Sequence, residues 1–402
     1  MEDKKLIKPF HIFSDKEYKR IDFYQKRGVS LQVHISDIHF GIMDPKTEYD
    51  ILYEQFIKKI IGLPLDCISI DGDLFDRLYT SNTDAVLYAN LFVSELIKIC
   101  KQNRADGIHT VLVIIMGTKN HDADQLKLFY PYLNDQELDL RIVEKIQFEL
   151  INGCRILCIP ELYDVSDDEY RRVLYESGAY DMVFMHGSIE GGVYDNKMGQ
   201  AKMFRPSDFS FCMGPVVAGH IHTGPALHGF CYYNGSPIRW NFGEEEPKGF
   251  QIVLYDMDSR YYYIHKEIIH SFKYNTISID DIIQCDPQEI IKYINDLREK
   301  EGIDYIRLKC LSNQDNKNTL DILKEYYRLD KTVKFKFEKE KSMDIKSMDE
   351  QSKSLYDQYS YFFNRSMSPY DILARYINES QSEVIVTADQ IINALKEVYY
   401  EN

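Results

Sequence analysis

The 402-residue sequence contains no long hydrophobic run. Nothing in it approaches the ~18 consecutive apolar residues that a membrane-spanning helix needs. The N-terminal stretch MEDKKLIKPFHIF is also too polar for the apolar segment of a signal peptide. We therefore expect a soluble, cytoplasmic protein that does not associate with a membrane.

The sequence also lacks a C-x-x-C pair and an excess of basic over acidic residues. The eight cysteines include no C-x-x-C pair, so we expect reduced thiols within the core. The formal net charge is -16, which argues against a protein that coats nucleic acid through a broad basic surface. A nucleic-acid enzyme stays compatible with this charge if it has a local basic groove or bound metal ions.

Short apolar runs are present, and they alternate with helical patterns between about residues 29 and 270. Examples are the runs LQVHIS and VLVIIM and the helical stretch DAVLYANLFVSELIKIC. This alternation predicts a layered α/β fold. Several runs end in His, Asp or Asn beside Gly, and ligands of α/β sheets bind beyond the carboxyl ends of strands.

The flanking regions differ in pattern. Residues 1–30 are polar and are predicted to form an N-terminal extension before a main domain over 31–270. Residues 274–339 predict a small α/β unit of strand, helix (about 287–300), strand, helix (about 318–328) and strand.

The C-terminal region is predicted to contain a linker and a helical tail. Residues 340–366 are rich in Ser, Lys, Asp and Gln, which is typical of a linker. Residues 367–402 contain two helix starts, one at Ser368-Pro369 and one at Thr387.

Five short segments place metal-ligand residues directly after predicted strands. A lone His or Asp at such a place is usually structural, but two His at positions i and i+2 of an extended segment point the same way. The mixture of imidazole, carboxylate and amide suits Mn, Fe or Zn, and all five segments together favour a metal centre. The segments are SDIHFG (Asp37, His39), DGDLFD (Asp73, Asp76), GTKNHD (Asn120, His121), MHGS (His186) and AGHIHT (His220, His222).

This order of motifs resembles the calcineurin-like metallophosphoesterases over roughly residues 31–225. The resemblance implies a two-layer β-sandwich flanked by helices and a centre with two divalent metal ions, for which we expect Mn²⁺. It implies three ligands for each ion and one bridging carboxylate: Asp37, His39 and His222 for one ion, Asn120, His186 and His220 for the other, and Asp73 between them.

The resemblance also implies the catalytic roles. Two cations ~3.5–4 Å apart hold a phosphate and activate a water molecule. His121 would donate a proton to the leaving oxygen, for which an imidazole with a pKa near ~6.5 is suited, and Asp76 would orient its ring. Arg77 and Lys119 are the candidate substrate-binding cations, although Lys119 is equally well explained as a solvated loop charge.

The GTKNHD loop departs from the family motif, in which glycine directly precedes asparagine. Here Thr118 and Lys119 intervene, and the longer loop could displace Asn120. Of the seven implied ligands, Asn120 is therefore the least secure.

A second resemblance concerns Tyr232 to Phe250, YYNGSPIRWNFGEEEPKGF, which is similar to a segment of the SbcD-type nucleases of double-strand-break repair and phage recombination. It implies a Mn-dependent DNA exonuclease and endonuclease that acts at DNA ends and works with an SMC-like ABC ATPase (SbcC-like). Residues 274–339 would then be a DNA-capping domain and 367–402 an ATPase-docking segment, and a homodimer is expected. The acidic charge predicts weak DNA affinity for the isolated chain.

Other interpretations stay open. Gly-Ser-Pro is ordinary turn chemistry, Trp240 is better explained by packing than by base stacking, and the lysines of VKFKFEK usually form a solvated strand face. The tail could fold back on the core. The chain could also be another metallophosphoesterase, such as a phosphatase or cyclic-nucleotide phosphodiesterase, or a non-catalytic DNA-end scaffold.

Overall fold

The computed structural model describes residues 28–161, 165–166, 169–170, 172–176, 178–191, 203–244, 246–279, 285–311 and 317–338. The predicted linker and helical tail, and nearly all of the predicted N-terminal extension, lie outside these residues. No helix in the described part of the chain is both long and apolar enough to cross a bilayer.

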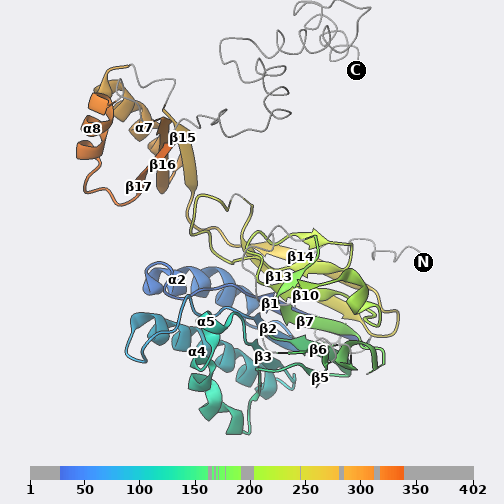
Figure 1. The fold of residues 1–402 in the computed structure, drawn as a ribbon. Coiled ribbons are helices and arrows are strands. Elements are labelled where there is room, and N and C mark those ends of the chain that lie inside the picture. The colour runs from blue at the N-terminus through green and yellow to red at the C-terminus, as the bar shows by residue number, and fades with distance from the viewer. Residues whose placement is uncertain are drawn as a thin grey trace, which may run out of the picture. The chain divides into compact units, whose positions relative to one another are not determined.

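Two six-stranded mixed sheets form the core of the described residues (Figure 1). The first has the order β14-β13-β1-β2-β3-β4, and β1 to β4 run parallel. Its strands are β1 (Val29–Ile35), β2 (Cys67–Asp71), β3 (Val111–Ile115), β4 (Asp139–Val143), β13 (Gly249–Asp256) and β14 (Tyr262–Ile268).

The second sheet has the order β11-β12-β10-β7-β6-β5, and its strands β12, β10, β7 and β6 run parallel. Its strands are β5 (Gln147–Ile151), β6 (Cys154–Ile159), β7 (Met182–His186), β10 (Val216–Gly219), β11 (Ala226–Leu227) and β12 (Cys231–Tyr233). A separate pair, β8 (Ser188–Ile189) and β9 (Met203–Phe204), lies outside both sheets.

The central strands β2, β3, β7 and β10 are buried on both faces, as is typical of parallel strands covered on both sides. In β3, Val111, Val113 and Ile115 belong to a cluster that contains residues of both sheets. Leu112 and Ile114, at the alternate positions, belong to a second cluster with the helices on the other face. The cysteines of these clusters are buried free thiols, as predicted, whereas Cys285 is exposed.

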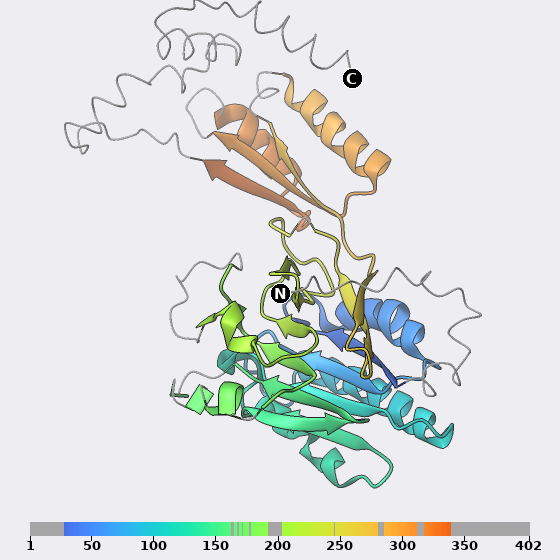
Figure 2. The ribbon, with the colours of Figure 1, turned by 90° about the vertical axis from the view of Figure 1, so that its right-hand side faces the viewer.

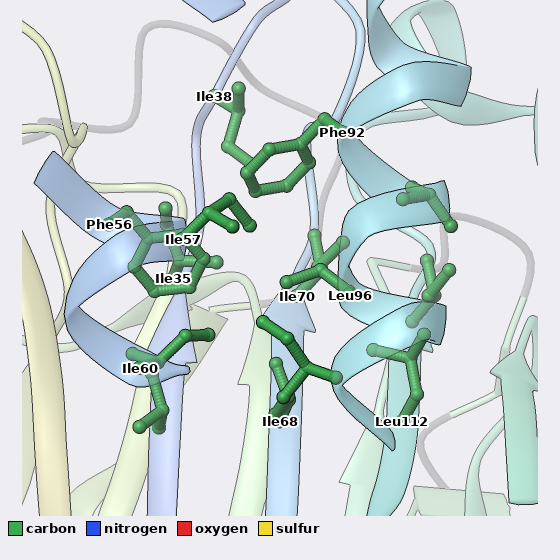
Figure 3. Packing of buried hydrophobic residues seen from close by; sticks show 14 of the residues in the cluster. Ile35, Ile38, Phe56, Ile57, Ile60, Ile68, Ile70, Phe92, Leu96 and Leu112 are labelled. Carbon is green, nitrogen blue, oxygen red and sulfur yellow. The ribbon is translucent and has the colours of Figure 1, made fainter. Parts of the chain in front are cut away.

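Helices cover the outer face of the first sheet. They are α2 (Pro45–Leu52), a π-helical turn η1 (Tyr53–Ile57), α3 (Lys58–Ile60) and α4 (Asp84–Ala105). Asp44 caps α2 by accepting a hydrogen bond from the Thr47 N–H. Figure 3 shows Phe56 of η1 beside Ile35 of β1, and Phe92 of α4 in the same cluster. Burying each large apolar side chain contributes about 1.5–3 kcal/mol.

Shorter elements complete this part: α5 (Lys119–Asp122), the 3₁₀ segments η2 (Gln125–Asn134) and η5 (Pro206–Phe209), and the π-helical turn η3 (Arg172–Glu176). The α/β class with two sheets and flanking helices is thus confirmed.

The last described residues form a three-stranded sheet of order β15-β16-β17 with two helices (Figure 2). The elements are β15 (Tyr274–Ser278), α7 (Pro287–Glu301), β16 (Tyr305–Leu311), α8 (Lys317–Tyr326) and β17 (Val333–Glu338). Ile306 and Leu308, two positions apart on β16, share one face and pack in a cluster with both helices. The predicted order of strands and helices is confirmed, and the role as a DNA-capping domain stays a prediction.

Candidate metal centre

The candidate residues stand at the carboxyl ends of neighbouring parallel strands. In the first sheet these strands are β1, β2 and β3, and in the second they are β10, β7 and β6. Parallel neighbours end at the same edge of a sheet, so residues that follow them lie close together. The predicted ligands there are Asp37 and His39 after β1, Asp73 after β2, His186 at the end of β7, and His220 and His222 after β10.

Asp37, His39 and His222 form a first donor group, whose ligand atoms all lie within 4.8 Å of one another. His222 Nε2 is 3.3 Å from His39 Nε2 and 3.8 Å from Asp37 Oδ1. Burial lowers the pKa of His39 to about 4, so this ring is neutral near pH 7, as a metal ligand must be. The structure therefore brings together the three residues predicted to bind one ion.

Asp73 lies between this group and His186. Its Oδ2 is 3.7 Å from His39 Nε2 and 3.3 Å from His186 Nε2. Burial opposes a charge on Asp73, yet the nearby His186 and His39 hold the pKa of its carboxyl well below the usual value. An ionised carboxylate between two sets of imidazoles is what a bridging ligand requires.

His186 is fully buried and its ring orientation is fixed. Its Nδ1 donates to the Asp71 carbonyl oxygen at 2.8 Å, a contact typical of metal-binding histidines. Its Nε2 makes no hydrogen bond to the described residues and faces Asp73. Burial opposes a charge on the ring, yet Asp73 raises the pKa of His186 well above its usual value. The carboxylates around His186 thus favour a positive charge at the position where a cation would bind.

Sequence reasoning missed Glu161, which follows β6 and is only 4% exposed. Its Oε2 lies 3.5 Å from His220 Nδ1 and 3.7 Å from His186 Nε2. Glu161, His186 and His220 form a second donor group that could hold a metal ion. The available signal was a glutamate directly after the strand run RILCIP, because the other five segments also place a ligand-type residue after a strand.

Asn120, the predicted ligand of the second ion, is exposed in the short helix α5. Its side chain makes no hydrogen bond to the described residues. The residue of this loop that contacts the centre is Thr118, whose N–H donates to Asp73 Oδ1 at 2.6 Å. The ligand role of Asn120 stays a prediction, and the structure places Glu161 beside the same two histidines.

His121 lies next to the first donor group. Its Nδ1 is 3.1 Å from His39 Nδ1 and 3.1 Å from the Phe75 carbonyl oxygen. Asp76, predicted to orient this ring, instead pairs with Arg77 at 2.6 Å. The contact that orients His121 is therefore the Phe75 carbonyl. Arg77 is 67% exposed.

The segment Tyr232 to Phe250 contributes a second layer of contacts. Glu244 Oε1 lies 3.4 Å from His222 Nδ1, and the buried Lys248 donates to the His222 carbonyl oxygen at 2.8 Å. The Trp240 ring packs edge-on against His39 and His222, with ring centroids 5.2 and 5.1 Å apart. Trp240 thus lies at the wall of the site, beside two candidate ligands.

The backbone is unusual at the same place. Asp37, His39, Asp73 and His220 have φ values of 52°, 55°, 52° and 101°. Such left-handed conformations cost on the order of 1–3 kcal/mol each and gather at functional sites. Gly117 is required by close approach, because a Cβ atom there would lie 2.2 Å from the Asp73 backbone nitrogen.

Two carboxylates and four imidazoles thus form two donor groups, and a third carboxylate, Asp73, lies between them. Such a set of oxygen and nitrogen donors suits Mn, Fe or Zn. Compared with protein-family models and with curated protein sequences, the chain matches none.

Proposed function

We propose that this chain is a Mn-dependent phosphodiesterase that cleaves DNA through a two-metal centre. One observation carries the proposal: two donor groups, built from residues that follow strands of both sheets, lie on either side of the ionised Asp73. Two ions bound there would hold the phosphate and activate the attacking water. The metallophosphoesterase fold implied by the sequence motifs is part of the proposal.

The residues of the chain perform the remaining tasks. The first donor group would hold one ion, and His186 and His220 the other. The Phe75 carbonyl accepts from His121 Nδ1 and so leaves Nε2 as the ring atom that can donate a proton to the leaving oxygen. Arg77, which is exposed and pairs with Asp76, would contact the phosphate, as would the exposed Lys119.

The proposal of DNA as substrate rests on the segment from Tyr232 to Phe250, which resembles that of the SbcD-type nucleases. The structure gives this segment contacts with the site, through Glu244 and Trp240. It also contacts the small α/β unit, because Phe242 packs against Tyr274 and Arg307 lies over Phe242. An SMC-like ATPase partner and a homodimer belong to the same proposal.

The test is cleavage of a linear, end-labelled duplex in the presence of Mn²⁺, Mg²⁺ or a chelator. Wild type is compared with His121→Ala and with His109→Ala, a control at an exposed histidine that pairs with Asp139. We expect Mn-dependent cleavage that is lost in His121→Ala and kept in His109→Ala.

Two results would contradict the proposal. His121-dependent hydrolysis of an aryl phosphodiester without cleavage of DNA, with an SMC-like ATPase added, would show a working centre with another substrate. Absence of any Mn-dependent hydrolysis, together with DNA binding, would favour a non-catalytic scaffold.

A further inference from the structure

We propose that Glu161 is a ligand of the second metal ion, in the place where the sequence motif implies the amide of Asn120. The inference rests on the proposed function because it assigns one ligand of the same metal centre. The second ion would then have a charged carboxylate ligand instead of a neutral amide ligand.

The geometry around Glu161 is that of a ligand. Its Oε2 is 3.5 Å from His220 Nδ1 and 3.7 Å from His186 Nε2, and the three ligand atoms lie within 4.8 Å of one another. Ligands that share an ion at ~2.1 Å are themselves about 3–4 Å apart. One cation could therefore contact all three with little movement.

His186 supplies an independent observation. It is 0% exposed, and its Nε2 makes no hydrogen bond to the described residues. A buried polar atom without a hydrogen bond is costly, and here the atom faces the carboxylates of Asp73 and Glu161. A cation between these groups would satisfy the nitrogen and both carboxylates at once.

The position of Glu161 is fixed by the loop that was expected to supply asparagine. The Glu161 N–H donates to the Met116 carbonyl oxygen at 3.3 Å, so the backbone of Glu161 lies against the end of β3. Thr118 Oγ1 donates to Glu161 Oε2 at 2.8 Å, and the Thr118 N–H donates to Asp73 Oδ1. Thr118 therefore positions two carboxylates of the site, whereas Asn120 lies on the exposed helix α5.

The exchange of an amide for a carboxylate has an electrostatic consequence. Asp37, Asp73 and Glu161 would offset three of the four positive charges of two divalent ions. A carboxylate is also a harder ligand that suits Mn²⁺. We therefore expect the second ion to bind firmly, with one unit of positive charge less for the phosphate than an asparagine ligand would leave.

The test measures metal content rather than catalysis. Each protein is loaded with Mn²⁺, freed of unbound metal by gel filtration, and analysed by mass spectrometry for Mn per chain and by electron paramagnetic resonance for coupled Mn pairs. We expect two coupled ions in wild type and in Asn120→Ala. We expect one uncoupled ion in Glu161→Gln, which keeps the size of the side chain but removes its charge.

The opposite pattern, with the second ion lost in Asn120→Ala and kept in Glu161→Gln, would overturn the assignment. Thermal unfolding of the chelated proteins checks that the variants fold. If Glu161→Gln does not fold, Asn120→Ala alone decides: retention of the coupled pair supports Glu161, and its loss overturns the proposal. Wild type that binds no Mn²⁺ would instead overturn the proposed function itself.

Discussion

His34 Nδ1 on β1 donates a hydrogen bond to Asp71 Oδ2 on β2 at 2.9 Å, and both side chains are fully buried. Ser69 and Asn234 also donate to the Asp71 carboxylate. The Asp71 carbonyl oxygen accepts from His186 Nδ1. Asp71 therefore links polar groups of both sheets to a candidate metal ligand.

Asp71→Asn should destabilise the protein by about 2–4 kcal/mol. The new amide nitrogen cannot accept the hydrogen bonds that now reach the carboxylate, and buried donors would be left without partners. The measurement is urea unfolding in the presence of a chelator. The matched control is Asp50→Asn, at a 53% exposed residue paired with Lys46, which should change stability by less than ~0.5 kcal/mol. Equal effects of the two variants would contradict the importance of the buried network.

Glu244→Gln should weaken binding of the ion at the first donor group by about 10–100-fold. Glu244 lies 3.4 Å from His222 Nδ1, and outer partners of this kind orient a ligating imidazole and raise its basicity. Titration calorimetry with Mn²⁺ measures the affinity. Glu246→Gln, at an exposed residue of the same segment, is the control and should bind as wild type does. An unchanged Mn²⁺ affinity in Glu244→Gln would show that Glu244 does not orient His222 for metal binding.

Glu48 should make the stability of the protein depend on pH. It is buried in the first turn of α2, accepts from the Gly41 and Met43 N–H groups, and burial raises its pKa from 4.5 to about 7. Between these two values the unfolded chain releases a proton that the folded protein keeps. The contribution of Glu48 to the free energy of unfolding is therefore largest below pH ~4.5, falls as the pH rises, and levels off above ~7.

Glu48→Gln should remove this dependence. Relative to the variant, wild type should lose up to about 3 kcal/mol between pH 4.5 and pH 8. Urea unfolding at both pH values in the presence of a chelator measures the difference. Glu54→Gln, at an exposed residue paired with Lys58, should show no such change. If wild type and Glu48→Gln differ in the free energy of unfolding by the same amount at both pH values, the pKa of Glu48 is not raised.

The sequence predicted the alternation of strands and helices and most of the site, because the ligand-type residues directly follow strands. Asp37, His39 and Asp73 could be identified because they belong to a set of five strand-end segments whose order resembles a known family. Glu161 could not be identified in this way, since a single glutamate after a strand is common and its meaning depends on two histidines far along the chain. Asn120 depends on the path of a loop, which its sequence does not determine.

The buried polar network shows a second limit. In LQVHIS, apolar and polar residues alternate, which is the pattern of a strand with one solvated face. Gln32 and His34 are nevertheless fully buried, because their face lies against the second sheet, where His34 meets Phe184. Their hydrogen-bond partners come from other strands, so only the three-dimensional structure explains why polar residues occupy this face.

The candidate ligands come from both sheets, with Asp37 and Asp73 on one and His186 and His220 on the other. A cation shared by these residues would act as a cross-link between the two layers, in a protein whose described cysteines form no disulfide. Spreading of the layers at this edge would release the ion, and chelation of the ion would loosen the edge. Metal affinity and the cohesion of the sandwich would then be two measurements of the same free energy.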